Sequence, residues 1–367
     1  MNFNLDPCED SLPEIQEAIQ HVIRNRQFIL GPHVSRFERD WAEYNQMPYC
    51  IGVGNGTDAI RIALLALGVK PGDEVISPAH NVAYTALAVA SIGAKNVYVD
   101  VDPNTMLMDL DDTARAITDR TRVILPVHLY GQMVDMERFA QLARGTGVLL
   151  VEDAAQAHGS TFKGCGPGWW SDAACFSHYP TKNLGAWGEA GSIVTRSPIV
   201  NERARLLRDG GRTDRYVHTL PGINSCLDEM QAAILTVKLP WLAKMNAQRR
   251  SLALRYREAL AYCPIQFQHT GAYDYEVDHL FVVRLYSPHA REPLMENLSY
   301  KGIPSLIHYP LILPHQPFAV ADALGQGPWP ISERIANSCL SLPLYPGMPT
   351  EEQDAVIAAV KEFFGVT

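Results

Sequence analysis

The chain has 367 residues, of which 47% are hydrophobic and 19% are charged, as in an ordinary globular protein. This length exceeds what one hydrophobic core usually holds, so we expect two domains. The net charge of −9 and the scattered Lys and Arg residues argue against nucleic acid as a partner.

Two further classes of protein are disfavoured. The longest nearly uncharged apolar segment, residues 82–94, is shorter than the ~20 residues that a membrane span needs, and residues 1–7 lack the pattern of a signal peptide. The seven cysteines form no CxxC pair and have no histidine at metal-ligand spacing. We therefore expect a cytoplasmic protein with no membrane association and no metal site.

The first two-thirds of the chain alternates short apolar runs with helical patterns. Strands that are apolar on both faces and separated by helices indicate a mostly parallel sheet covered on both sides. The expected strands are 75–77, 97–101, 123–127, 148–153, 174–177 and 192–195, and the expected helices lie near 57–68, 82–92, 110–117 and 135–145.

A strongly helical pattern over 227–260 follows, and Pro240 is expected to kink or divide it. The last third has a strand pattern at 279–285, helical patterns near 290–301 and 350–364, and a proline-rich region over 304–349. We predict an α/β fold in which the large domain, residues 1–240, holds a mostly parallel sheet between helices. A smaller C-terminal α+β domain would span 241–367, and the N-terminal segment is free to pack with it.

Polar residues that directly follow strands in such a sheet are candidates for ligand binding, because ligands collect beyond the carboxyl ends of the strands. Asp153 and Ser177 occupy such positions, and Lys182 follows five residues after Ser177. Pyridoxal phosphate requires a lysine for its aldehyde, a carboxylate at its pyridine nitrogen, a phosphate cradle and a group near its ring oxygen. The sequence offers a candidate for each.

Lys182 is the candidate lysine, and it would need a lowered pKa to act as a base. Asp153 can keep a proton on the pyridine nitrogen, but a carboxylate there can equally cap a helix. Gln156 can bond the ring hydroxyl if a turn follows Asp153. Gly56 and Thr57 begin an apolar helix, where backbone N–H groups and the helix dipole favour a phosphate. The hydroxyl of Ser177 is close enough in sequence to reach the same phosphate.

Together these runs resemble the sugar aminotransferase family called DegT/DnrJ/EryC1/StrS, a branch of the fold-type I pyridoxal phosphate enzymes. The resemblance covers nearly the whole chain. The segments that carry it are 28–32, 56–59, 99–103, 126–132, 152–159, 179–185, 228–233 and 308–310.

The resemblance implies a homodimer with active sites at the subunit interface. It assigns the Schiff-base lysine to Lys182, the pyridine partner to Asp153, the ring-oxygen contact to Gln156 and the phosphate contacts to Gly56, Thr57, Ser177 and, from the neighbouring subunit, Asn224.

Several positions depart from the family pattern. Val82 lies where many relatives place an aromatic ring that stacks on the pyridine, and Cys226 stands where an arginine is usual. Trp169, Trp170 and His178 also differ. A pocket lined by aromatic side chains could stack on a sugar or nucleotide base, although such side chains more often pack in the core; the candidates are Trp169, Trp170, His178, Tyr179 and Trp187.

The reaction that the resemblance implies moves an amino group from L-glutamate to a nucleotide-linked keto sugar. The sequence of residues 179–186 resembles that of family members acting at C3 of the sugar more than that of members acting at C4. One alternative is an aminotransferase acting on a keto cyclitol; a dehydratase is disfavoured because that branch replaces the lysine with histidine. A second alternative is a regulator that binds the cofactor without turnover. Such a protein would be expected to have a DNA-binding segment or a basic surface, and neither is evident.

Overall fold

The computed structural model describes residues 11–271, 274–323 and 326–366. Its centre is a seven-stranded sheet in the order β1-β8-β7-β5-β4-β2-β3. The pairs β3–β2, β2–β4, β4–β5 and β5–β7 are parallel, whereas β8 runs antiparallel to both β7 and β1. The strands are β1 (Tyr49–Val53), β2 (Glu74–Pro78), β3 (Lys95–Val99), β4 (Thr121–Ile124), β5 (Leu149–Asp153), β7 (Ala173–Ser177) and β8 (Gly191–Thr195).

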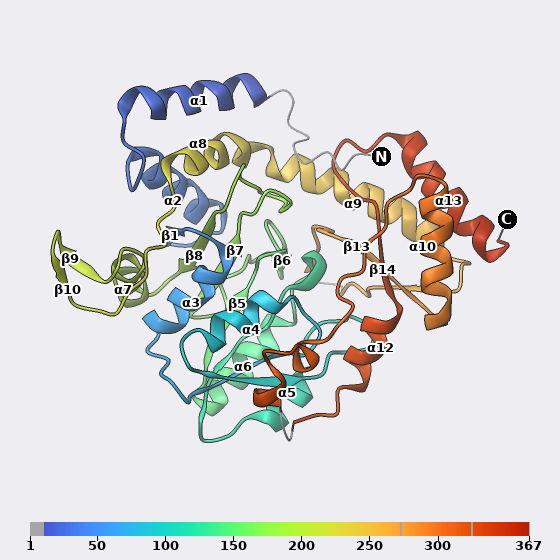
Figure 1. The fold of residues 1–367 in the computed structure, drawn as a ribbon, viewed down its shortest axis with the longest axis horizontal. Coiled ribbons are helices and arrows are strands. Elements are labelled where there is room, and N and C mark those ends of the chain that lie inside the picture. The colour runs from blue at the N-terminus through green and yellow to red at the C-terminus, as the bar shows by residue number, and fades with distance from the viewer. Residues whose placement is uncertain (1–10, 272–273, 324–325, 367) are drawn as a thin grey trace.

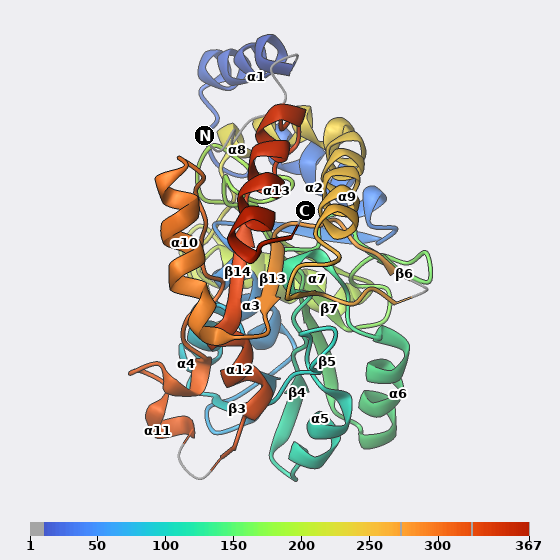
Figure 2. The same cartoon turned by 90° about the vertical axis from the view of Figure 1, so that its right-hand side faces the viewer.

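Helices cover both faces of this sheet, and Figure 2 shows α4 and α6 on either side of β4 and β5. The strands between them are almost wholly buried, as their continuous apolar sequences predict. The predicted α/β architecture with a mostly parallel sheet is therefore confirmed. The helices of this region are α2 (Pro32–Tyr44), α3 (Gly56–Ala66), α4 (Ala83–Ala90), α5 (Leu110–Ala116), α6 (Met136–Thr146) and α7 (Pro198–Arg208), with the short 3-10 turn η2 (Leu129–Gly131).

The long helical segment is divided where Pro240 predicts. Helix α8 (Glu229–Lys238) ends in the 3-10 turn η3 (Leu239–Trp241), and α9 (Leu242–Ala259) continues beyond it. Pro240 has no N–H to donate to the preceding turn, which accounts for the interruption. Figure 1 shows α8 and α9 following one another toward the C-terminal elements. The described N-terminal helix α1 (Leu12–Asn25) packs against α8.

The C-terminal part contains a smaller antiparallel sheet in the order β11-β13-β14, formed by Ile265–Phe267, Phe281–Leu285 and Cys339–Leu342. Helices α10 (Arg291–Tyr300) and α13 (Thr350–Phe364) pack on one another beside it (Figure 1), as a small α+β unit requires. The division at residue 240 stays a prediction. The remaining elements are the hairpin β9 (Arg212–Asp214) and β10 (Val217–His218), the pair β6 (Thr161–Phe162) and β12 (Asp274–Tyr275), the helices α11 (Val320–Ala323) and α12 (Pro330–Ser338), and the 3-10 turns η4 (Pro288–Ala290) and η5 (Leu313–His315).

Several elements were absent from the sequence-based expectation. The edge strand β1 carries Gly52 within it, and the glycine-rich run that follows obscured its apolar pattern. Strand β14 and helix α12 lie inside the proline-rich region 304–349, where the prolines sit at helix starts and between elements. Among the described residues, no helix combines the length and apolar composition needed to cross a bilayer.

Candidate active site

Three predicted residues lie along one edge of the large sheet. Asp153 ends β5 and pairs with Cys175 of the parallel neighbour β7, which ends at Ser177. Helix α3 begins at the same edge, because a Cβ atom built on Gly56 would lie 2.6 Å from Cβ of Ser177. The absence of a side chain at Gly56 thus allows the helix to start directly beside the Ser177 side chain.

The start of α3 is held firmly in place. Oδ1 of Asn55 accepts a 2.8 Å hydrogen bond from the backbone N–H of Asp58, and the Asp58 carboxylate accepts one of 2.7 Å from the Ser225 hydroxyl. The first N–H groups of a helix, here those of Gly56 and Thr57, have no acceptor within the helix itself. The arrangement leaves donors and a positive dipole end next to Ser177, which is what a phosphate group requires.

Asp153 is 3% exposed and its carboxylate is oriented by two donors. Oδ2 accepts a 2.6 Å hydrogen bond from the Thr85 hydroxyl, and Oδ1 accepts one of 3.1 Å from the N–H of Ala155. Asn81 in turn donates a 2.8 Å hydrogen bond to Thr85. Residues 154–160 form turns instead of a helix, so the alternative of a helix cap at Asp153 is wrong.

Lys182 lines a cavity of about 520 Å³, which we call the Lys182 cavity. Its walls are residues 180–183, side chains from α8 and α9, and residues 279–280, 306, 308–309 and 344–346, with Gln156 beside Tyr309. Burial lowers the pKa of Lys182 to about 8, and the negative charge of Asp153 opposes that shift. A much larger fraction of this amine is therefore neutral near physiological pH than of an exposed lysine, and the amine lies within electrostatic reach of Asp153.

Gln156 faces the Lys182 cavity from the turn that follows Asp153, as predicted. Its Oε1 accepts a 2.7 Å hydrogen bond from the N–H of Tyr130, and its Nε2 donates one of 3.1 Å to the Tyr309 hydroxyl. Tyr309 belongs to a recognised sequence segment, but sequence reasoning assigned it no role. These bonds fix the amide at the cavity wall.

A buried amide network holds the Lys182 loop from behind. Nδ2 of Asn183 donates a 2.9 Å hydrogen bond to Oδ1 of Asn246 on α9, and Oδ1 of Asn183 pairs at 2.9 Å with Nδ1 of His279. Since that oxygen can only accept, Nδ1 of His279 carries the proton. Sequence reasoning missed this network, because its members converge from three distant segments.

The five aromatic residues considered for a pocket wall do not line the Lys182 cavity. His178 is fully buried, with Nδ1 3.1 Å from the Leu184 carbonyl and Nε2 2.9 Å from the Ser192 hydroxyl. The Arg196 guanidinium lies 5.3 Å from the Trp169 ring, at another place on the surface. Of the described residues, the aromatic rings that line the cavity are those of His279, His308, Tyr309 and Tyr345, and none of Trp169, Trp170, His178, Tyr179 and Trp187 does so.

Lys182 and Gln156 are the predicted cofactor residues that line the Lys182 cavity. Asp153, Ser177, Gly56 and Thr57 lie at the sheet edge described above and are not among its lining residues, and neither are Asn224, Cys226 and Val82. Asn224 is exposed and pairs through its backbone with Asp209. Sγ of Cys226 lies 3.5 Å from the carbonyl of Arg208. Val82 stands at the N-terminus of α4, three residues before Thr85.

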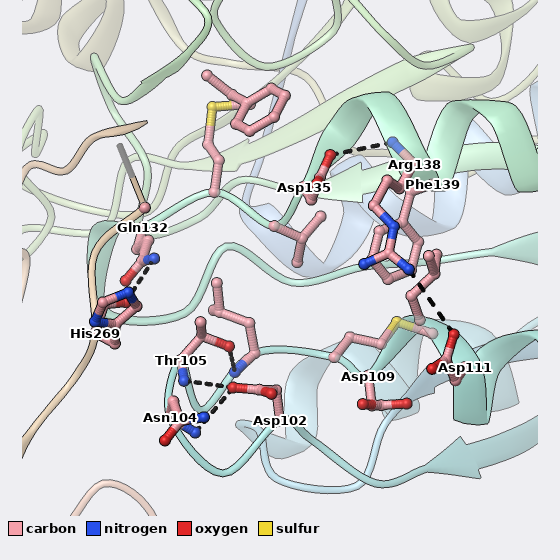
Figure 3. Close-up of a pocket in the computed structure, with 17 residues that line it drawn as sticks. Asp102, Asn104, Thr105, Asp109, Asp111, Gln132, Asp135, Arg138, Phe139 and His269 are labelled. Atoms are coloured by element: carbon pink, nitrogen blue, oxygen red, sulfur yellow. Dashed lines mark hydrogen bonds and ion pairs between the residues drawn. The ribbon is translucent and has the colours of Figure 1, made fainter. Parts of the chain in front are cut away.

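A second cavity of about 500 Å³ is lined by several aspartates but contains none of the predicted site residues (Figure 3). Its acidic groups have local partners, and the carboxylate of Asp111 of α5 lies 3.9 Å from the guanidinium of Arg138 on α6. Oδ1 of Asp102 accepts from the N–H groups of Asn104 and Thr105 at 2.8 and 2.7 Å, and Asp135 caps α6 by accepting from Arg138 at 3.1 Å. These contacts account for the carboxylates as local structure, so we do not treat this cavity as the active site.

Comparison with known proteins agrees with this geometry. Residues 9–361 match the model of the DegT/DnrJ/EryC1/StrS aminotransferase family. The chain belongs to this family. It is 41% identical to a Geobacillus stearothermophilus protein named pleiotropic regulatory protein, over 97% of this chain and 96% of the relative. It is 40% identical to the dTDP-3-amino-3,4,6-trideoxy-alpha-D-glucose transaminase of Streptomyces venezuelae, over 97% of this chain and 93% of the relative.

A solved member of the DegT/DnrJ/EryC1/StrS family has nearly the same fold. The crystal structure of DesV from S. venezuelae in complex with a ketimine intermediate superimposes with a TM-score of 0.96 at 39% identity, covering 100% of this chain and 99% of that one. The chain is therefore an aminotransferase with the fold-type I architecture, and the family uses pyridoxal phosphate.

Proposed function

We propose that this aminotransferase moves an amino group from L-glutamate to C3 of a nucleotide-linked keto sugar, in amino-sugar biosynthesis in the cytoplasm. The observation that carries this proposal is the cavity in which Lys182, with its pKa lowered to about 8, lies within electrostatic reach of the buried Asp153. A lysine in this environment suits proton transfer at carbon next to a cofactor.

The residues present fit pyridoxal phosphate. Lys182 would hold its aldehyde carbon, Asp153 its pyridine nitrogen, and Gln156 its ring oxygen. The clearance beside Gly56, which a Cβ atom would fill, suits its phosphate, with Thr57 and Ser177 as further contacts. When bound, the cofactor supplies an electron sink for the pair of electrons left on carbon when a proton is removed.

The protein's own part in the reaction is to move and hold protons. The neutral amine of Lys182 would accept the proton from the α-carbon of the donor, because a pKa near 8 leaves a useful fraction neutral at physiological pH. Asp153, held by Thr85 and Ala155, would keep a proton on the pyridine nitrogen. We propose that residues 1–240 and 241–367 form two domains that enclose the cavity between them.

The nature of the acceptor is supported by the named activity of the Streptomyces venezuelae relative, which forms an amino group at C3 of a dTDP-linked sugar. A keto cyclitol acceptor would use the same residues. The Geobacillus stearothermophilus relative carries a regulatory name. The residues proposed as base, carboxylate and phosphate cradle support turnover over a purely regulatory role.

We further propose a homodimer in which Asn224 reaches the phosphate of the neighbouring subunit's cofactor. Its exposed position supports a contact with another chain. Tyr179 and Trp187 are 46% and 42% exposed on the loop that carries Lys182, and apolar rings of this kind are enriched at subunit interfaces.

The test is the absorption spectrum of the purified protein loaded with pyridoxal phosphate, before and after L-glutamate is added without acceptor. Conversion of the visible band to the band of the aminated cofactor would support the first half-reaction. Candidate 3-keto nucleotide sugars and keto cyclitols are then compared for their ability to reverse the conversion. A spectrum that ignores L-glutamate at every concentration would refute the proposed donor.

A further inference from the structure

Helix α9 places a buried arginine in the wall of the Lys182 cavity. Arg249 is 9% exposed and lies one turn beyond Met245, which lines the same cavity. Helical spacing brings both side chains to one face of α9. Arg249 has no place in the function proposed above.

The guanidinium of Arg249 has few partners. Its Nη1 lies 3.3 Å from two backbone carbonyls, those of His279 and Leu344, and its Nε has no hydrogen-bond partner among the described residues. No ion pair within 4.0 Å involves Arg249 in the part of the chain that the structure describes. An arginine offers five N–H donors, so much of its bonding capacity remains for a ligand.

Two other arginines, the buried Arg208 and the half-buried Arg257, each have a carboxylate partner, whereas the buried Arg284, like Arg249, has no ion pair within 4.0 Å among the described residues. Arg208 forms a 2.5 Å ion pair with Glu38, and Arg257 forms one of 3.0 Å with Asp278. Burial of a cation without a counter-ion is costly, because the lost hydration is not replaced. Arg249 therefore lacks the direct ion pair that these two arginines have, and the negative charge of Asp278 acts on it only from beyond ion-pair distance.

Positive charge also collects around His279, which separates Arg249 from the Lys182 loop. Burial and the charges of Lys182 and Arg249 hold the pKa of His279 well below its usual range, so both cations lie close to this ring. Burial lowers the pKa of Arg249 to about 10, which keeps it charged near neutral pH. Among the described residues that line the cavity there is no aspartate or glutamate.

We propose that Arg249 binds the α-carboxylate of the amino donor. This inference rests on the proposed function, because it supposes an amino acid in the Lys182 cavity. A guanidinium matches a carboxylate through two parallel N–H donors, and the incoming anion supplies the missing counter-charge.

The donor fits better than the acceptor on chemical grounds. In an α-amino acid the carboxylate is bonded directly to the carbon that loses its proton, so both must lie in the cavity that holds Lys182. In a nucleotide-linked sugar the negative charges belong to phosphates on C1, which are several bonds from a keto group at C3. An anion subsite in the same cavity as the base therefore suits the donor.

The test compares Arg249→Gln with Arg250→Gln, both loaded with pyridoxal phosphate. Arg250 is a matched control because it is the next residue of α9, is 34% exposed and has its guanidinium 4.7 Å from the Tyr275 ring. In single-turnover conversion, Arg249→Gln is expected to need about 10- to 100-fold more L-glutamate, the loss typical of a charge-assisted pair. The concentration of keto sugar that Arg249→Gln needs to convert the aminated enzyme should change less than threefold. Arg250→Gln should resemble the wild type in both measurements.

The unmodified protein provides a second measurement that does not depend on folding of a variant. L-glutamate and its 1-amide differ only in the charge of the α-carboxyl group, so the wild type should prefer glutamate by a similar 10- to 100-fold. Glutarate, which cannot react, should raise the melting temperature of the wild type and of Arg250→Gln but not that of Arg249→Gln.

The outcomes separate this inference from the proposed function. A wild type that ignores L-glutamate would overturn both. If the wild type responds but accepts the 1-amide equally well, or if Arg249→Gln needs no more glutamate than Arg250→Gln, the carboxylate subsite is refuted and the proposed function stands. If Arg249→Gln impairs the donor half-reaction and the keto-sugar half-reaction equally, the carboxylate subsite is also refuted. Arg249 would then either contact both substrates or stabilise the packing of α9.

Discussion

The hydroxyl of Thr85 on α4 donates a 2.6 Å hydrogen bond to Oδ2 of Asp153 at the end of β5. Both side chains are buried, with 0% and 3% exposure, and 68 positions separate them in sequence. Asn81 supports the contact by donating to Thr85. The first turn of α4 thus sets the orientation of the carboxylate that we assign to the cofactor's ring nitrogen.

Thr85→Val keeps the shape of the side chain but removes the donor. We expect the turnover rate to fall about 10- to 100-fold, because hydrogen bonds to charged groups are worth ~1.5–3 kcal/mol. Thr85→Ser should restore most of the rate. Steady-state kinetics and the melting temperature are measured together, and a valine variant with the wild-type rate would show that Asp153 needs no such support.

The lowered pKa of Lys182 predicts a pH dependence for cofactor capture by the apoprotein. Only the neutral amine attacks an aldehyde, so the capture rate should rise about tenfold per pH unit below a midpoint near pH 8 and level off above it. Growth of the visible band is followed by stopped flow, with Lys182→Ala as the blank. If the capture rate keeps rising until the pH approaches 10.5, the ordinary lysine pKa, burial does not lower the pKa of this amine.

Gly56→Ala tests the close approach of α3 to Ser177. The added Cβ would lie 2.6 Å from Cβ of Ser177, so the helix start must shift away from the proposed phosphate position. We expect affinity for pyridoxal phosphate to fall at least about tenfold, because the helix N-terminus would lose its contacts with the phosphate. Fluorescence titration of the apoprotein measures this affinity.

Gly145→Ala is the matched control for that substitution. Gly145 lies within α6, and a Cβ there would meet nothing within 4 Å. Alanine at such a helical position is expected to stabilise the protein by about 0.5–1 kcal/mol and leave the affinity unchanged. If Gly56→Ala binds the cofactor as tightly as Gly145→Ala, the phosphate does not lie at the start of α3.

Hybrid dimers test the proposal that Asn224 acts across the subunit interface. Lys182→Ala and Asn224→Ala are each expected to be inactive or strongly impaired alone. In a random mixture half of the dimers are hybrids, and each hybrid has one site with both natural residues, so about a quarter of the wild-type activity should return. The two variants are co-expressed with separate affinity tags, which confirm the hybrids, and the activity is then measured. If no activity returns, Asn224 lies in the same site as Lys182 of its own subunit, or outside the site.

The sequence predicted most of what lies within single segments. The parallel strands, the division near Pro240 and the positions of Asp153 and Ser177 at strand ends follow from local apolar patterns and from the missing N–H of proline. Lys182 and Gln156 could be assigned because each lies a few residues beyond a strand end. Short segments fix such relationships, since the chain has little freedom over a few residues.

The tertiary structure decided which side chains face the Lys182 cavity. For His178 the sequence left a pocket wall and core packing open, and the structure places its ring in the core, within hydrogen-bond distance of Leu184 and Ser192. Thr85 and Arg249 come from helices far from Lys182 in sequence and were not predicted. What these two side chains contact depends on how their helices pack in the folded chain. That packing brings together segments that are distant in sequence, so local sequence patterns do not predict it.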